Sequence, residues 1–505
     1  MSLVAKYKFR PMNMLFTALG GLGSVCYGYN AMVISNTLAQ PSFIHYMGLD
    51  QRDDANDLIG LTGSLFQLGG FIGTFFISFF ADRWGRRVGL AVPAAMLVVS
   101  AAILAGSVHI GMFIAGRFLT GAGACMIVSA VTLWISEIVP PKVRGSFVNV
   151  NGASILIGGA MAAWIGYGFA QLHPGDLDSS QWRAPLAIAA LPPLVLLSFL
   201  SWLPESPRWL VKEGRDEDAK QALNRLCVPE EAADEFLQIH LQLEHDRHLE
   251  SSYMSILRKP SYRKRAILAM LTTISTQMTG PLVIVNYGPI IYSTLGFDTN
   301  KQLIYQAGWI LTGLAGGLIS LFIVDMISRP KLFAVGIIGT VTMLAIEAAL
   351  VATYAPNPEA LENPNTAALK AAVAMFYIYI LYFEATLQGV QFVYLGEIFP
   401  MHLRAKGVGI GIAALCAINI MWLQVAPTAF ANIGWKFYLC FIIPGTAMAI
   451  MILIFWPNTK QMPLEEIAAL FGDEVERVEQ HTQDEKALSV HEASLDYNEK
   501  VKTVN

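Results

Sequence analysis

Charged residues are scarce in this 505-residue chain. They account for 14% of the sequence, against roughly 25% in an ordinary soluble domain, while 54% of the residues are hydrophobic and the mean hydropathy is +0.48. A water-soluble chain of this length cannot hide so much apolar surface. The composition therefore excludes a soluble globular protein and indicates a chain embedded in a membrane.

Residues that carry enzyme or metal chemistry are also few. The five cysteines show no metal-ligand spacing, and Cys26, Cys125, Cys416 and Cys440 lie in apolar runs, where we expect small core residues. No nucleophile–base pair or phosphate-cradling glycine loop stands out, so we predict no enzyme activity, no metal and no cofactor. The net charge of −4 gives no basic field, which argues against a nucleic-acid partner.

The apolar residues come in runs of about 20, the length that crosses the hydrocarbon core of a bilayer. The sequence thus predicts an all-α membrane protein with twelve spans. The spans are expected at about 14–35, 58–80, 88–108, 111–137, 147–170, 184–203, 265–293, 304–326, 332–354, 370–396, 407–430 and 436–456.

Basic residues concentrate in alternate loops. The loops at 81–87, 138–145, 327–331 and 401–406 are rich in Arg and Lys, whereas the intervening loops are acidic, polar or proline-containing. Short loops rich in Arg and Lys stay on the cytoplasmic side. Because the number of spans is even, we expect both termini in the cytoplasm of a multi-pass protein, in the plasma membrane.

The spans divide into two groups of six. We expect residues 14–203 and 265–456 to form the two halves, and residues 204–264 to form a cytoplasmic loop with amphipathic helices at 213–226 and 229–245. The cytoplasmic ends are then residues 1–13 and 457–505. The tail after about 473 is acidic, polar and nearly free of aromatic residues, which predicts disorder.

Short motifs recur in the two groups. The stretch Glu137–Gly145 is echoed by Glu397–Ala405, and in both the carboxylate stands seven residues before an arginine. A weaker echo relates Asp82–Arg87 to Asp325–Lys331. Two similar halves with a substrate site between them, near the bilayer midplane, are a known transporter design.

These motifs are candidates for a gate. An Asp at the end of span two, beside several arginines, can hold neighbouring helices together by charge-assisted hydrogen bonds on the cytoplasmic face. We expect such a latch to close the inner side in the outward-open state; the alternative is that the arginines only set topology. The predicted gating residues are Asp82, Arg86, Arg87, Glu137, Arg144, Glu205, Arg208, Glu397 and Arg404.

In combination these motifs resemble the sugar porter family of the major facilitator superfamily, over roughly residues 14–470. The chain is similar to a fungal-type member. The resemblance implies a pseudo-symmetric major facilitator fold of two six-helix halves. The motifs that carry it are Asp82–Arg87, Gly116-Arg117, Glu137…Arg144-Gly145, Pro204–Leu210, Glu397–Pro400, and Pro457–Lys460 with Pro463–Glu466.

The chain departs from the family at the position that couples transport to protons. Proton symporters of the family carry Gly-Tyr-Asp in span one, beside the span-four arginine that matches Arg117, whereas this chain has Asn30. Asn cannot titrate, and facilitative members also carry Asn there, so the resemblance favours uniport. Glu347 and Glu384 lie within apolar runs, where ionisable groups are costly and usually face an interior or a cavity. Glu384 is therefore a candidate substitute proton carrier, or else a neutral structural residue.

The chain also departs from the family at several substrate positions. The amide expected after Asn151 is replaced by Gly152, and an expected Asn is Leu282. A stacking Trp is replaced by Phe392, and Thr276 stands for a Gln. The resemblance implies substrate contacts by the remaining polar groups and aromatic walls, which are Gln277, Asn286, Tyr287, Gln388, Gln391, Phe392 and Asn419. Some of these amides can instead join helices to one another.

The resulting prediction is a monomeric transporter that moves a sugar or a related small polar solute by alternating access. It is either secondary-active, with protons as the second ligand, or facilitative. One alternative is a carrier of a specialised metabolite or an organic acid, acting as an exporter, because several sugar-binding amides are lost while the gate motifs remain. A second alternative is a sugar sensor that does not transport, against which the short stretch after 470 argues.

Overall fold

The computed structural model describes residues 11–138, 144–172, 178–226, 232–233, 235–237, 239–240, 252–324, 326–355, 365–400, 403–460, 462, 467 and 470–472. The chain divides into two compact units, Met1–Lys460 and Gln461–Asn505. The description below concerns the first unit. The predicted disorder after about 473 and most of the predicted helix at 229–245 lie outside the described residues.

The described residues form helices and their connections, with no strand among them. The first group of helices comprises α1 (Pro11–Ala39), α2 (Pro41–Tyr46), η2 (Leu49–Gln51), α3 (Ala55–Trp84), α4 (Arg86–Ala105), α5 (Ile110–Ile138), α6 (Arg144–Leu172), α7 (Ser180–Ile188), α8 (Leu191–Phe199), α9 (Pro207–Lys212) and α10 (Asp216–Leu226). The second group comprises α12 (Tyr253–Arg258), α13 (Pro260–Gln277), α14 (Pro281–Thr294), α15 (Thr299–Ile323), α16 (Arg329–Tyr354), α17 (Thr366–Phe383), η4 (Glu384–Gln388), α18 (Gly389–Glu397), α19 (Arg404–Ile433), η5 (Gly434–Tyr438) and α20 (Leu439–Phe455).

The predicted fold class is confirmed. Ten segments of the described residues are long and apolar enough to cross a membrane, judged by length and composition. One of these segments, Lys406–Phe455, contains both α19 and α20, and α1 precedes the first of them. Each of the twelve predicted spans therefore has a helix, or a pair of consecutive helices, at its position.

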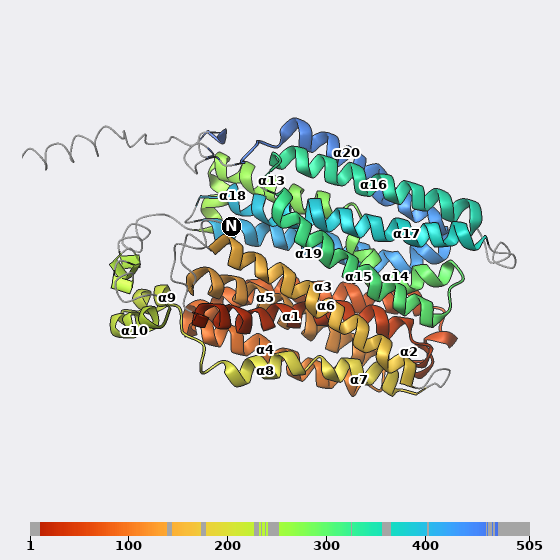
Figure 1. Cartoon of the computed structure of the whole chain (residues 1–505), viewed down its shortest axis with the longest axis horizontal. Coiled ribbons are helices and arrows are strands. Elements are labelled where there is room, and N and C mark those ends of the chain that lie inside the picture. The colour runs from red at the N-terminus through yellow and green to blue at the C-terminus, as the bar shows by residue number, and fades with distance from the viewer. Residues whose placement is uncertain are drawn as a thin grey trace, which may run out of the picture. The chain divides into compact units, whose positions relative to one another are not determined.

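The helices form two halves that lie side by side (Figure 1). Helices α1 to α8, coloured red to yellow, pack around the pairs α3–α5, α1–α6 and α4–α5, and helices α13 to α20, coloured green to blue, pack around α16–α17, α13–α19 and α16–α20. The halves meet along α3–α19, α6–α15 and α1–α14. Helices α9 and α10 lie at one end of the bundle, beside the ends of α3, α4 and α5 (Figure 1). We call this the basic end, and the opposite end, where α2 lies, the seam end.

Glycines allow the closest helix contacts within the N-terminal half. A Cβ on Gly121 of α5 would lie 1.9 Å from the carbonyl oxygen of Phe66 on α3, and a Cβ on Gly28 of α1 would lie 1.9 Å from that of Ile155 on α6. Neither approach leaves room for any side chain. In a membrane, where hydrophobic association between helices is weak, such backbone approach is a main source of helix packing.

Three predicted spans are interrupted. Span seven breaks between α13 and α14 at Gly280, whose φ of +79° is a left-handed conformation that favours glycine, and Pro281 then begins α14. Span six breaks between α7 and α8, where Pro192 and Pro193 begin a new helix. Span ten contains a π-helical turn, Glu384–Gln388, between α17 and α18. Pattern alone predicted continuous helices because the overall hydropathy of a span does not record a local break in the helix.

The loop after span six folds back on the N-terminal half. Ser206 caps α9 by accepting a hydrogen bond from the backbone N–H of Trp209 at 3.2 Å. The apolar face of α10, with Ala219 and Leu223, belongs to the same buried cluster as Ile138 at the end of α5. The amphipathic helix predicted at 213–226 thus corresponds to α10, which begins after a turn at Gly214 with φ +73°.

Candidate functional site

Arg117 is the charged group at the centre of the N-terminal half. Its side chain is 1% exposed, on α5, and it donates to the carbonyl oxygens of Asn30 on α1 at 3.0 Å and Thr62 on α3 at 3.3 Å. The guanidinium carbon lies 4.4 Å from the ring centroid of Phe66. Charge-assisted hydrogen bonds and a cation–π contact therefore hold the cation, and they tie three helices together.

The side chain of Asn30 does not pair with Arg117. It donates to the carbonyl oxygen of Cys26, one turn earlier on α1, at 2.9 Å, and its Oδ1 has no partner among the described residues. The backbone of Asn30, rather than its side chain, contacts the arginine. This region of the site thus contains a fixed positive charge and a neutral amide.

The predicted substrate residues of α13 and α14 differ in their surroundings. Gln277 ends α13, is 6% exposed and has no hydrogen-bond partner for its amide among the described residues. Asn286 donates to the carbonyl oxygen of Leu282 at 2.9 Å, within its own helix. Tyr287 donates to the carbonyl oxygen of Leu423 on α19 at 2.9 Å and joins helices within the C-terminal half. Of the three, Gln277 is the one whose side-chain amide makes no hydrogen bond to a described residue.

The predicted residues of spans ten and eleven lie on α18, η4 and α19. Gln391 is fully buried and donates to Oε1 of Gln388 at 2.9 Å. Phe392, one residue further on, is 44% exposed. Asn419 is 2% exposed, and its Oδ1 has no partner among the described residues.

The two intramembrane glutamates occupy different places in the C-terminal half. Glu384 begins the π-helical turn and packs against the glycine face of α15, where a Cβ on Gly316 would lie 3.0 Å from its own Cβ. Glu347 of α16 is 1% exposed, has neither carboxyl oxygen hydrogen-bonded within the described residues, and interacts with Tyr292 and Tyr438. Among these, Glu384 sits in the type of helix irregularity that often marks a functional site.

A seam of hydrogen bonds joins the halves along α3 and α19. Oγ of Ser64 donates to Oε1 of Gln424 at 2.7 Å, and Nε2 of Gln424 donates to the carbonyl oxygen of Asp57 at 3.2 Å. Thr428 donates to the carboxylate of Asp57 at 2.8 Å. Gly60 lets the backbones touch, because a Cβ there would lie 2.6 Å from the carbonyl oxygen of Gln424. This seam was not predicted, since none of these residues belongs to a motif.

The seam continues at two further points. Gln171, at the end of α6, donates to Oδ1 of Asn300, at the start of α15, at 2.6 Å. A Cβ on Gly63 would lie 3.2 Å from both Leu423 Cβ and the hydroxyl of Tyr287. All these contacts lie in the part of the bundle nearer to α2, so they close the seam end.

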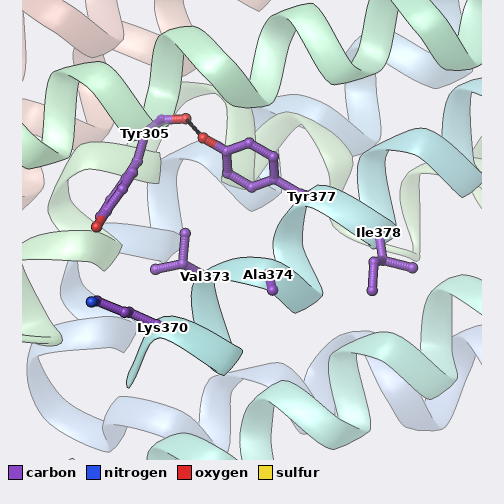
Figure 2. Close-up of a pocket in the computed structure, with 6 residues that line it drawn as sticks. All are labelled: Tyr305, Lys370, Val373, Ala374, Tyr377 and Ile378. Atoms are coloured by element: carbon purple, nitrogen blue, oxygen red, sulfur yellow. Dashed lines mark hydrogen bonds between the residues drawn. The ribbon is translucent and has the colours of Figure 1, made fainter. Parts of the chain in front are cut away.

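A pocket of about 400 Å³ lies in the C-terminal half, between α15 and α17 (Figure 2). It is lined by Tyr305, Lys370, Val373, Ala374, Tyr377 and Ile378. Tyr377 donates to the carbonyl oxygen of Tyr305 at 2.7 Å across it. None of the predicted substrate residues lines this pocket, and all its lining residues come from one half, so we do not assign it to transport.

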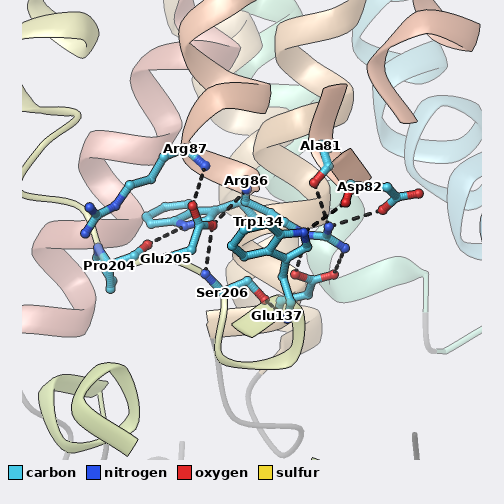
Figure 3. Close-up of polar contacts among 10 residues, drawn as sticks. Ala81, Asp82, Arg86, Arg87, Trp134, Glu137, Pro204, Glu205 and Ser206 are labelled. Atoms are coloured by element: carbon cyan, nitrogen blue, oxygen red, sulfur yellow. Dashed lines mark hydrogen bonds and ion pairs between the residues drawn. The ribbon is translucent and has the colours of Figure 1, made fainter. Parts of the chain in front are cut away.

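An ion-pair cluster ties α3, α4 and α5 at the basic end (Figure 3). Arg86 binds Glu137 through two hydrogen bonds of 2.8 Å and also donates to the carboxylate of Asp82 at 3.1 Å and to the carbonyl oxygen of Ala81 at 2.9 Å. The side chains of Arg86 and Glu137 are each 10% exposed. This fork geometry is the strong form of an Arg–carboxylate pair.

Glu205 completes the cluster from the loop after span six (Figure 3). Its carboxylate accepts the backbone N–H groups of Arg86 at 2.8 Å, Arg87 at 3.2 Å and Ser206 at 3.0 Å. It thereby occupies the N-terminus of α4, where free N–H groups and the helix dipole favour an anion. Gly85, with φ +95°, lets the carboxylate approach, because a Cβ there would lie 2.7 Å from Glu205 Oε2.

An equivalent cluster ties α16, α18 and the end of span twelve in the C-terminal half. Arg329 binds Glu397 at 2.8 and 3.2 Å and donates to the carbonyl oxygen of Val324. Thr459 donates to the same carboxylate at 2.6 Å. The pair Arg329–Glu397 thus repeats Arg86–Glu137, one in each half.

The partners of these carboxylates lie in other motifs than their own. The predicted latch joined Asp82, Arg86 and Arg87 to Glu137 and Arg144, and to Glu397 and Arg404. In the structure Arg86 binds Glu137 and Arg329 binds Glu397, and each arginine opens the span that precedes its carboxylate. The Arg144 side chain lies outside the described residues, and Nε of Arg404 is buried without a partner. Arg329 was missed as a functional candidate, although its place at the start of span nine matches that of Arg86 at the start of span three.

The remaining predicted gating residues make fewer contacts. Arg87 joins the cluster in Figure 3 through its backbone N–H, and Nε of its side chain has no partner among the described residues. Arg208 is half-buried in α9. The carboxylate of Asp82 is the outermost of the cluster, with 54% of its side chain exposed.

Comparison with known proteins places the chain among transporters. The family model described as "Sugar (and other) transporter" matches residues 15–471. The MFS-type transporter criB of Aspergillus cristatus is 28% identical over 487 residues, which are 95% of each chain. The sugar transporter STL1 of Saccharomyces cerevisiae is 28% identical, over 92% of this chain and 82% of that protein. The xylose transporter XylE from E. coli, in a partially occluded inward open conformation, superposes with a TM-score of 0.77 at 22% identity, over 90% of this chain and 100% of that one.

Proposed function

This chain belongs to the sugar transporter family and is a membrane transporter of the alternating-access type, and on that premise we propose that it carries a sugar or a related polyhydroxylated solute by facilitated diffusion. Buried amides on both sides of the interface between the halves support the solute class. An amide both donates and accepts hydrogen bonds, which is what a sugar hydroxyl requires of its partners.

The surroundings of Arg117 support uniport, that is, transport without coupled protons. Its charge is held by two carbonyl oxygens and an aromatic face, and the side chain beside it is the amide of Asn30. A carboxylate at that position would gain and lose a proton and change its attraction to the arginine in each transport cycle. An amide cannot do this, so the site has no proton-dependent step at Asn30.

The contacts between the halves support an inward-facing state. We place the basic end in the cytoplasm because Arg and Lys cluster there. The seam then closes the extracellular side. The clusters around Glu137 and Glu397 each lie inside one half, so they keep each half rigid while the halves rock, and the proposed latch between halves would form only in the outward-facing state.

The proposal extends to the setting of the protein. We expect a monomer in the plasma membrane, with both termini in the cytoplasm and the bilayer as its permanent partner. The twelve-span architecture supports termini on one side of the membrane, because an even number of spans returns the chain to the side on which it began.

The first test is ligand-dependent thermal stabilisation of the purified, full-length carrier. A solute that binds only the folded state raises the melting temperature as its concentration rises above its dissociation constant. We expect a shift with D-xylose, D-glucose or glycerol. A shift with an organic acid or an apolar natural product, and none with these three, would move the assignment to a carrier of specialised metabolites.

The second test concerns protons. In proteoliposomes we expect uptake of the stabilising solute to be the same with and without a pH gradient, and Glu384→Gln to leave this independence unchanged. Uptake that requires the gradient in the wild type and loses this requirement in Glu384→Gln would make Glu384 the proton carrier and contradict uniport. The matched control is Glu217→Gln, which alters an exposed residue in the loop helix α10.

A further inference from the structure

The N-terminal half lacks the amide that the family supplies from span five. Gly152 occupies that position on α6, and no atom lies within 4 Å of the point where its Cβ would be. The half must contact a hydroxylated solute from elsewhere if both halves are to respond to it. Among its buried amides, one on α3 is a candidate for this contact.

That candidate is Gln67. Its side chain is 4% exposed, and no residue described in the structure provides a hydrogen-bond partner for its amide. Leaving a buried amide unpaired is unfavourable, so its partner is a molecule that enters the site: water or a solute. Asn36, by contrast, donates to the carbonyl oxygen of Ala162 at 2.9 Å, and Gln40, whose Nε2 also lacks a partner among the described residues, lies just before α2 at the seam end.

The register of α3 against α19 places Gln67 opposite the C-terminal half. Gly63 meets Leu423 in the seam, and Gln67 and Asn419 are each four residues, or about 6 Å, further toward the basic end. One turn beyond, a Cβ on Gly70 would lie 2.5 Å from Sγ of Cys125, which in turn interacts with Cys416 on α19. Contacts between the halves therefore bracket the level of Gln67 and Asn419 on both sides.

Asn419 mirrors Gln67 in its chemistry. It is 2% exposed, and its Oδ1 is buried without a partner. Two unpaired amides, one from each half, thus lie at one level beneath the seam. Each amide offers two N–H donors and one carbonyl oxygen as acceptor, which suits neighbouring hydroxyl groups on one solute.

We propose that Gln67 is a solute-binding residue and that, with Asn419, it forms an amide pair that binds neighbouring hydroxyl groups of the solute across the two halves. The inference rests on the proposed function, since it assumes a polyhydroxylated solute. Binding by the pair draws α3 and α19 together and so favours a closed seam.

The test uses the full-length carrier and D-xylose, D-glucose and glycerol as probes. Dissociation constants from thermal shifts are compared for wild type, Gln67→Ala, Asn419→Ala and the double variant. We expect each single variant to raise the dissociation constant about tenfold or more, and the double variant to add less than the sum of the two effects, because both residues bind one solute. Asn36→Ala is the matched control: it removes a paired buried amide and should lower the melting temperature without changing the dissociation constant.

A dissociation constant unchanged in Gln67→Ala, with a wild type that binds a probe, would overturn the inference and leave the proposed function standing. A wild type that binds no probe would defeat the proposed function, and the assignment of Gln67 is then decided by accessibility. With all five cysteines replaced by serine, Gln67→Cys should react with a negatively charged methanethiosulfonate reagent, whereas Ala94→Cys, in the buried core, should not. A Gln67→Cys variant as unreactive as Ala94→Cys would overturn the inference.

Discussion

At the seam end, hydrogen bonds cross from one half to the other, whereas at the basic end the described ion pairs stay inside one half. Ser64, Asp57 and Gln424 join α3 to α19 through neutral or singly charged hydrogen bonds. Arg86–Glu137 and Arg329–Glu397 are forked, charged and largely buried. The strong interactions therefore hold each half together, and the weaker ones hold the halves to each other.

This difference suits a carrier that must change state without unfolding. A neutral hydrogen bond stabilises by about 1 kcal/mol net, whereas leaving one member of a buried ion pair without its partner costs about 3–5 kcal/mol. A seam built of the first kind can open in the transport cycle. Clusters of the second kind keep the helices of each half in register as it moves.

The largest effect should come from blocking the seam. In Gly60→Leu the new side chain would begin 2.6 Å from the carbonyl oxygen of Gln424, so α3 and α19 can no longer meet. We expect uptake in proteoliposomes to fall about a hundredfold or more, equivalent to about 3 kcal/mol in the closed state. Gly168→Leu, at an exposed position of α6 where a Cβ has no neighbour within 4 Å, is the control and should transport normally. Equal activity of the two variants would show that seam closure is not part of the cycle.

The next effect is on stability at the basic end. Glu137→Gln removes the charge from the pair with Arg86 and leaves a largely buried guanidinium with Asp82 as its only described carboxylate partner. We expect the free energy of unfolding to fall by about 3 kcal/mol, seen as a lower melting temperature in detergent. Glu397→Gln should do the same, and the two losses should add because the clusters lie in different halves.

A Glu137→Gln variant with unchanged stability would contradict the role given to the cluster. The control is Glu217→Gln, which changes a carboxylate whose side chain is 83% exposed and should leave the melting temperature within the error of the measurement.

The smallest effect should come from a single seam hydrogen bond. Ser64→Ala removes the donor to Gln424 and should shift the equilibrium between the two facing states by about 1 kcal/mol, or roughly fivefold, toward the open seam. The shift is measured as the labelling rate of a cysteine introduced at Asn56, an exposed residue beside the seam. A rate equal to that of the wild type would mean that the bond contributes nothing to closure.

Sequence pattern predicted the helices well because apolar length is nearly all that a membrane span requires. It did not predict the breaks at Gly280 and in the π-helical turn at Glu384, because these depend on tertiary contacts that the apolar pattern does not record.

The candidate site was only partly accessible to sequence reasoning. Motifs identified Glu137 and Glu397 but not Arg329 as the partner of Glu397, because spacing along one helix says nothing about which neighbouring helix supplies the arginine. Gln67 and Gln424 belong to no motif, and only the packing of α3 against α19 reveals that their amides lie between the halves. Whether the predicted substrate residues bind solute stays a prediction.

Alternating access requires the two ends of the bundle to open in turn. Distances between paired spin labels in liposomes test it most directly, with one pair at the seam end (positions 171 and 300) and one at the basic end (positions 83 and 331), both measured with and without the stabilising solute. Alternating access predicts opposite changes at the two ends. Molecules with a short label distance at the seam end have a long one at the basic end, and solute shifts the distance distributions of both label pairs together. A seam distance that stays fixed while the basic end opens and closes would contradict it.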